Sequence, residues 1–118
     1  MAKYFDESEF ACKCCGQLPE QGMSEVLVEK LDQLRENLGC PIFVNSGYRC
    51  PYNNMLAGGV PNSQHLLGTG ADITCYAKPI SELVEEALKI GFDGVGIYED
   101  FVHVDCRDGG RSPNYYRW

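Results

Sequence analysis

The two histidines of this chain, His65 and His103, are its best candidates for metal chemistry, and Asp72 lies between them in sequence. A catalytic zinc ion is commonly held by three protein ligands, which leave a fourth position for water. Two neutral imidazoles and one carboxylate leave net positive charge on the metal, and this charge acidifies water at the open position. His65, Asp72 and His103 are therefore candidate ligands, although two histidines among many carboxylates are more often surface or core residues.

The local sequence around these residues favours a metal site. His65 and Asp72 flank a stretch with two glycines, whose backbone freedom lets a loop curl and bring Asp72 back towards His65. His103 lies in a predicted strand, where Asp105 shares its face by the two-residue alternation. We expect Asp105 to orient a ligand through the far imidazole nitrogen rather than to bind the metal. The alternative is a tight turn and a half-buried strand histidine.

Two helices are predicted to support this site. The first spans about residues 24–38, because leucines recur there at the spacing of one helical face. Ser24 is a suitable N-cap for it, and Gly39 a suitable C-terminal stop. The second helix is predicted over 79–90, and Gly91 ends it.

Four short apolar segments read as strands: 41–45, 71–76, 95–98 and 101–106. Residues 51–57 have room for one or two helical turns, and the Gly- and Asn-rich stretch 58–70 reads as a loop. Residues 1–23 and 109–118 show no clear period. The fold class expected is α+β, a small antiparallel sheet with two main helices.

The length and composition limit the number of domains and the class of protein. A chain of 118 residues fits one domain, residues 1–118, and its 44% apolar and 23% charged residues are ordinary for a globular protein. The net charge of −7, without a basic cluster, argues against a nucleic-acid partner. No apolar run approaches a membrane span, so membrane insertion is not expected. The first seven residues also lack the apolar stretch of a signal peptide.

The seven cysteines leave several readings open. An odd number prevents complete internal pairing, and reduced thiols are the default without a secretion signal. Cys12, Cys14 and Cys15 are close enough in sequence to recruit a structural zinc ion together with another thiol. A disulfide that involves this group is the other alternative. The sequence spacing alone does not distinguish among reduced thiols, a structural zinc site and a disulfide.

The pattern Ser63-x-His65-x-x-Gly68-x-Gly70-x-Asp72, followed by His103-Val104-Asp105, resembles the zinc D-Ala-D-Ala peptidases. This group includes D,D-carboxypeptidases, the D,D-dipeptidases of glycopeptide resistance and phage endolysins that cut peptidoglycan. The resemblance covers about residues 40–107, and the start Phe10-Ala11-Cys12 is also similar. One departure is Gly70, where the family usually has alanine, so we expect a looser loop with metal binding intact.

The resemblance implies a fold, a cofactor and a substrate. The fold would be the Hedgehog/D,D-peptidase type in a single zinc peptidase domain. The cofactor would be Zn²⁺ on His65, Asp72 and His103. The substrate would be D-Ala-containing peptidoglycan stem peptides, cut by D,D-carboxypeptidase or endopeptidase action, and sequence does not separate these two.

Further roles follow from the resemblance. Asp100, three residues before the last histidine, matches the family's general base, and Arg49 matches an arginine placed near the scissile carbonyl. Ser63 occupies a position that contacts substrate termini, and Tyr98 is an aromatic candidate for the peptide groove. The plainer alternatives are a hairpin-turn aspartate, a surface ion pair, a turn cap and aromatic packing.

Two rival functions belong to other classes. One is a non-catalytic zinc-binding recognition module of the same fold, which would have no need of both Asp100 and Arg49. The other is a cysteine-rich redox or metal-storage protein. We expect a monomer that is made in the cytoplasm and acts on the cell wall after release or export. The small size and the lack of a signal favour a phage-derived origin.

Overall fold

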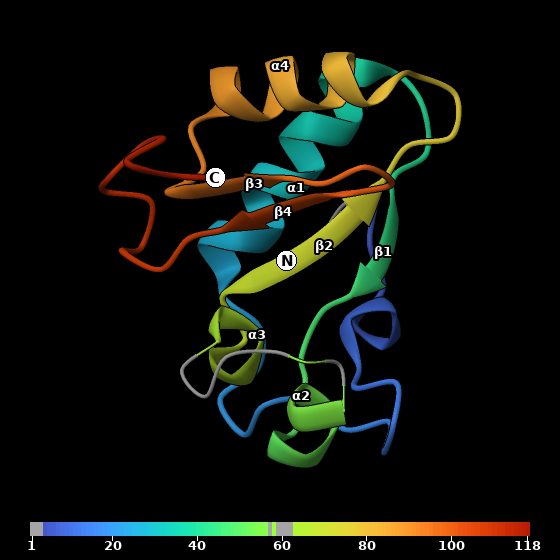
Figure 1. The fold of residues 1–118 in the computed structure, drawn as a ribbon, viewed down its shortest axis with the longest axis vertical. Coiled ribbons are helices and arrows are strands. Elements are labelled where there is room, and N and C mark those ends of the chain that lie inside the picture. Colours follow the sequence, from blue (N-terminus) through green and yellow to red (C-terminus); the bar gives the residue numbers. More distant parts are fainter. Residues whose placement is uncertain (1–3, 57, 59–62) are drawn as a thin grey trace.

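The computed structural model describes residues 4–56, 58 and 63–118 and has an α+β architecture (Figure 1). Its sheet has five strands in the order β1-β2-β4-β3-β5. The strands are β1 (Phe43–Ser46), β2 (Gly70–Thr74), β3 (Gly94–Ile97), β4 (Val102–Asp105) and β5 (Tyr116–Arg117). The predicted α+β class is confirmed, and each of the four predicted strands is present with shifted ends.

Two helices, α1 (Glu25–Leu38) and α4 (Ile80–Ile90), pack against each other and form the helical layer (Figure 1). Both were predicted. The Ser24 hydroxyl caps α1 by accepting the Leu27 N–H at 3.3 Å, and Gly39 ends it in the left-handed conformation. The buried side chains Leu27, Leu31, Leu34, Leu83 and Ala87 face the core. Apolar spacing was therefore sufficient to locate this layer.

Strand alternation divides the sheet into an apolar face and a polar face. Ala71 and Ile73 of β2 join Val102 and Val104 of β4 in the core cluster with the helices. Residues at the intervening positions must point to the opposite face, because side chains alternate along a strand. This polar face carries Asp72 from β2, and His103 and Asp105 from β4, all buried.

The sheet is mixed, so the prediction of a purely antiparallel sheet was wrong. β1, β2, β4 and β3 pair antiparallel, but β5 pairs parallel with β3, with Tyr116 opposite Gly94. A strand of two residues has no detectable period, which is why residues 109–118 gave no signal. The tail is nonetheless ordered along the sheet edge.

Three shorter helices accompany these elements: η1 (Glu7–Phe10), α2 (Pro51–Leu56) and α3 (Gln64–Leu67). The helical turns predicted in 51–57 are confirmed for 51–56. η1 corrects the expectation of an irregular start, and α3 corrects the expectation of a loop over 58–70. Residues 57 and 59–62 of these predictions lie outside the described residues. Among the described helices, none is long and apolar enough to cross a membrane.

The side chain of Asp93, fully buried before β3, holds the segment that leads into β5. Its Oδ2 accepts N–H groups of Asp108 at 2.9 Å and Gly110 at 2.8 Å, and its Oδ1 accepts that of Ser112 at 2.8 Å. Three backbone donors are thus satisfied by one carboxylate, in place of a regular ladder. This carboxylate is therefore one of the contacts that hold the tail against the sheet edge.

Asp93→Ala is expected to lower the free energy of unfolding by at least about 2 kcal/mol, because three backbone donors lose their acceptor. Urea unfolding followed by circular dichroism measures this change. Glu85→Ala, at an exposed position of α4, is the control and should stay within about 0.5 kcal/mol of wild type. Equal stability of the two variants would show that the tail is held by other contacts.

Candidate metal centre

His65 is positioned by the short helix α3. The Ser63 hydroxyl caps this helix by accepting the His65 backbone N–H at 3.2 Å, and Gly68 ends it with φ of 73°. The imidazole Nδ1 donates to the Gly47 carbonyl at 2.7 Å. This bond fixes the ring orientation and leaves Nε2 free to accept a metal, a pattern common for ligand histidines.

His103 meets Asp72 because β2 and β4 pair with these two residues opposite each other. His103 Nδ1 lies 3.0 Å from Asp72 Oδ1, and His65 Nε2 lies 3.2 Å from the same oxygen. One potential ligand atom from each of the three residues falls within 4.8 Å of the others. The predicted ligand set is thus brought together, from one helix and two strands.

The donor set fits a metal ion better than a polar core. Asp72 and His103 are 7% exposed and His65 is 3% exposed, yet their polar atoms converge on one point. Two imidazole nitrogens and one carboxylate oxygen are the donors of a catalytic zinc site with an open fourth position. Imidazole suits zinc better than it suits magnesium or calcium, which prefer oxygen ligands.

Arg49, which was predicted to lie near the scissile carbonyl of a substrate, lies beside the ligand carboxylate. Its Nη2 is 3.2 Å from Asp72 Oδ2, and its Nε donates to the Ser46 hydroxyl at 3.0 Å. Burial would raise the pKa of Asp72, but hydrogen bonds and charge from His103 and His65 hold that pKa well below its usual range. Asp72 is therefore ionised at neutral pH, ready to bind a cation.

Asp105 occupies the outer position that the alternation predicted. Its Oδ2 lies 2.8 Å from His103 Nε2, on the side of the ring away from Asp72. Burial would raise the pKa of Asp105, but hydrogen bonds from His103 and Arg107 lower it to about 2. For His103, burial lowers the pKa, and the bonds to Asp105 and Asp72 outweigh this and raise it. Asp105 thus sets the orientation and tautomer of this ligand.

Arg107 is a residue that the sequence analysis missed. Its Nε donates to Asp105 Oδ1 at 3.0 Å and its Nη2 donates to Oδ2 at 2.8 Å. The two parallel bonds match the planar guanidinium to the carboxylate. The signal available was its place two residues after Asp105 in the sequence.

Two glycines of β3 leave room for the residues that support His103. Gly94 pairs with Asp105 and Gly96 pairs with His103 in the ladder. A Cβ on Gly94 would collide with the Asp105 carboxylate, and a Cβ on Gly96 would lie 2.6 Å from the Trp118 indole. The Trp118 ring lies 5.1 Å from the His103 ring. These glycines therefore permit the close approach of both supporting side chains.

The remaining predicted site residues are exposed or half-buried. Asp100 is exposed in the β3–β4 turn, and its carboxylate has no hydrogen bond or ion pair within the part of the chain that the structure describes. Tyr98 stacks on Phe101 at 4.5 Å and its hydroxyl accepts the Trp118 indole N–H at 2.7 Å. Ser63 caps α3, the plainer of its two alternatives. Substrate contact by these three residues stays a prediction.

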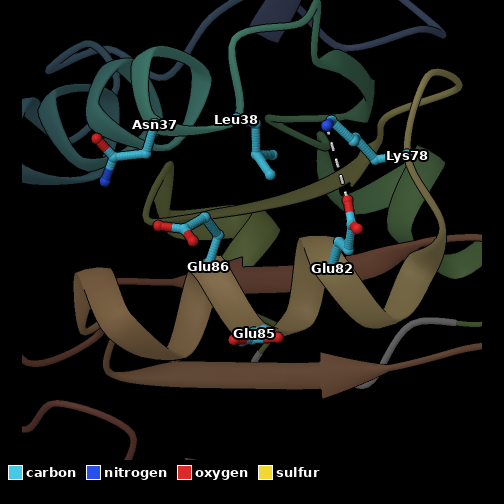
Figure 2. A pocket seen from close by; sticks show the side chains of 6 residues that line it. All are labelled: Asn37, Leu38, Lys78, Glu82, Glu85 and Glu86. Atoms are coloured by element: carbon cyan, nitrogen blue, oxygen red, sulfur yellow. Dashed lines mark ion pairs between the residues drawn. The ribbon is translucent and has the colours of Figure 1, made fainter.

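A hollow of about 270 Å³ lies elsewhere, in the helical layer (Figure 2). Its carboxylates are partnered by exposed lysines: Lys78 lies 3.8 Å from Glu82, and Lys89 lies 3.5 Å from Glu85. It contains none of the metal-site residues. The lining residues are Asn37, Leu38, Lys78, Glu82, Glu85 and Glu86. This hollow is ordinary charged helix surface.

Six of the seven cysteines fall into three groups in space, and Cys14 is exposed. Thiols of Cys12, Cys15 and Cys50 converge within 4.8 Å of one another. Cys40 and Cys75 form a buried pair with sulfurs 2.8 Å apart, and Cys106 is buried separately. Burial would raise the pKa of Cys12, but backbone N–H groups, led by that of Cys50, lower it to about 6. The sequence did not identify Cys50 as the distant member of the first group.

Asp105→Asn is expected to weaken metal binding about 10–100-fold, because the amide no longer fixes the imidazole as a carboxylate does. Zinc competition against a chromogenic chelator measures the affinity. Asp108→Asn, three residues along the chain, is the matched control and should bind as wild type does. An affinity unchanged in Asp105→Asn would mean that His103 needs no outer partner.

Comparison with known proteins agrees with this site. The sequence model of the family described as Peptidase M15 matches residues 3–105. A zinc D-Ala-D-Ala carboxypeptidase of Streptomyces albus G is 33% identical over 90 residues, which cover 71% of this chain and 35% of that protein. The match therefore spans about a third of the length of this relative. Because the family model covers most of the chain and the metal ligands lie inside the matched range, this protein belongs to the Peptidase M15 family.

Proposed function

We propose that this protein is a zinc peptidase that hydrolyses D-Ala-containing stem peptides of peptidoglycan. The observation that carries the proposal is the convergence of His65, Asp72 and His103 within 4.8 Å, with Arg49 against the ligand carboxylate. Membership of the Peptidase M15 family supports peptide hydrolysis. The name of the Streptomyces relative supports zinc as the metal and D-Ala-D-Ala as the substrate class.

Zinc at this site would supply a Lewis acid for the scissile carbonyl and acidify the attacking water. Arg49 would stabilise negative charge that develops on the carbonyl oxygen. Its side chain is 14% exposed and its guanidinium is held by Ser46 and Asp72, so its position is set before substrate arrives. A fixed donor is effective in the transition state because it needs no reorganisation.

Asp100 would act as the general base. It would take a proton from the attacking water and pass it to the leaving amine. Its exposed carboxylate lacks a partner within the described residues, so substrate binding need not break an existing bond to free it. The short β3–β4 turn, closed by the Tyr98 N–H to the Phe101 carbonyl at 3.1 Å, keeps Asp100 near the start of the strand that carries His103.

Substrate orientation is assigned to two residues at the rim. Tyr98 presents an exposed aromatic face, stiffened by Phe101 and by the bond from Trp118. Ser63 lies two residues before His65, and its hydroxyl remains half-buried while it caps α3. Contact of either residue with a peptide terminus would distinguish stem peptides from other chains.

The wider setting of the proposal has four parts. Residues 1–118 act as one zinc peptidase domain, and its fold is the Hedgehog/D,D-peptidase type. The protein works as a monomer. It acts on the cell wall after release or export, as a phage-derived endolysin would. Cleavage is of the D,D-carboxypeptidase or the endopeptidase type.

Asp100→Asn is expected to lower kcat about 10²–10⁴-fold with zinc content unchanged, because the base is lost and the ligands are not. Glu99→Gln, the neighbouring exposed carboxylate in the same turn, is the matched control and should retain wild-type activity. The substrates are a stem pentapeptide that ends in D-Ala-D-Ala and a cross-linked stem dimer, with products identified by mass spectrometry.

Release of free D-Ala from the pentapeptide would assign carboxypeptidase action, and cleavage of the dimer alone would assign endopeptidase action. Full zinc occupancy without cleavage of either substrate would contradict the proposal and leave a zinc-binding recognition module. Equal loss of activity in Asp100→Asn and Glu99→Gln would remove the specific role of Asp100.

A further inference from the structure

A second group of metal-binding side chains lies outside the site described above. Cys12 and Cys15 come from the segment that follows η1, and Cys50 follows Arg49 just before α2. Their sulfurs lie within 4.8 Å of one another, although 35 residues separate Cys15 from Cys50 in sequence. Thiolates are zinc ligands, so three converging thiols are a candidate metal site.

The backbone around these thiols is shaped to direct them to one point. The Cys12 N–H donates to the Gln17 carbonyl at 2.8 Å, and the Gly16 N–H donates to the Cys12 carbonyl at 2.7 Å. Gly16 adopts φ of 71°, which turns the chain sharply after Cys15. The result is a closed turn that brings the thiols of Cys12 and Cys15 close together.

Backbone N–H groups also point at two of the sulfurs, as they do at thiolates. The Cys50 N–H donates to Cys12 Sγ at 3.5 Å, and the Asn53 N–H donates to Cys50 Sγ at 3.4 Å. Such bonds stabilise negative charge on sulfur, and the thiolate is the form that binds metals. A zinc ion between the sulfurs would compensate the negative charge of the thiolates without a lysine or an arginine.

A fourth thiol is available beside the three. Cys14 is exposed, and desolvation together with the neighbouring Cys50 thiol raises the pKa of Cys14. Closed structural zinc sites have four ligands, with Zn–S of about 2.3 Å and therefore sulfurs about 3.8 Å apart in a tetrahedron. The three converged sulfurs already lie within 4.8 Å of one another, close to that spacing. A short move of the exposed Cys14 would complete the site.

We propose that Cys12, Cys14, Cys15 and Cys50 bind a second zinc ion with a structural role, separate from the ion on His65, Asp72 and His103. Zinc would displace the thiol protons and join the two segments that carry these cysteines. This accounts for four of the seven cysteines. The buried Cys40–Cys75 pair and Cys106 have no part in it.

The second ion would stabilise the segment that positions Arg49. Cys50 is adjacent to Arg49, whose N–H donates to the His65 carbonyl at 3.1 Å. Tyr48 donates to the Phe10 carbonyl at 2.8 Å, and a Cβ on Gly47 would lie 2.7 Å from the Phe10 backbone. The N-terminal segment is thus packed directly behind residues 47–50. A tetrathiolate ion there would fix the distance between the two segments.

The test uses the full chain, purified with reductant and loaded with zinc or with cobalt(II) alone. Wild type should hold about two zinc ions and His103→Ala about one. The cobalt form of His103→Ala should keep an intense thiolate-to-cobalt charge-transfer band. Cys15→Ser, at an exposed position that creates no cavity, should lose that band and about one ion, and should melt at a lower temperature.

Cys75→Ser is the matched control, since it removes a thiol outside the cluster and should retain two ions and the band. Cys50→Ser repeats the test from the other segment. The proposal is overturned if wild type binds about one ion, if the cobalt band is absent, or if Cys15→Ser and Cys50→Ser keep both ions. Loss of the first ion in His103→Ala tests the peptidase site separately, so failure of one site is distinguishable from failure of the other.

Discussion

Asp72 is a buried carboxylate, and its negative charge constrains the elements around it. An ionised carboxylate removed from water is strongly destabilising unless it is paired and hydrogen-bonded. Here the partners are His65 from α3, His103 from β4 and Arg49 from the segment after β1. Three parts of the chain must therefore dock onto β2 for the fold to tolerate Asp72. The same three contacts assemble the ligands and the neighbouring guanidinium.

A series of side-chain contacts supports the metal ligands from outside the ligand set. Asp105 holds His103, Arg107 holds Asp105, and the Arg107 guanidinium lies 4.4 Å from the Tyr116 ring in β5. Because β5 is reached through the loop that Asp93 fastens, a contact far from the metal ligands contributes to the orientation of one of them. The parallel edge strand thus belongs to the architecture of the site as well as to that of the sheet.

Two kinds of feature could be predicted from the sequence. One is a long helix with a repeated apolar pattern, and the other is a contact between residues that are close together in the chain. The leucine face of α1 and the alternation that places His103 and Asp105 together were both readable. α3 was not, because four residues are too few to show a helical period, although Ser63 and Gly68 were suitable caps. The meeting of Cys50 with Cys12 and Cys15 was also hidden, because it depends on the packing of Phe10 against Gly47. Arg49 was located only through a family resemblance, since its partner Asp72 is 23 residues away.

The position of Trp118 gives the molecule an optical property. It is the chain's single tryptophan, and its indole lies against the ring of His103 while its N–H bonds to Tyr98. Indole fluorescence is sensitive to the charge of a neighbouring imidazole, so emission from this one ring reports on the state of His103. The protein therefore contains an intrinsic probe at its own metal ligand, and occupancy can be followed in real time without a dye or a label.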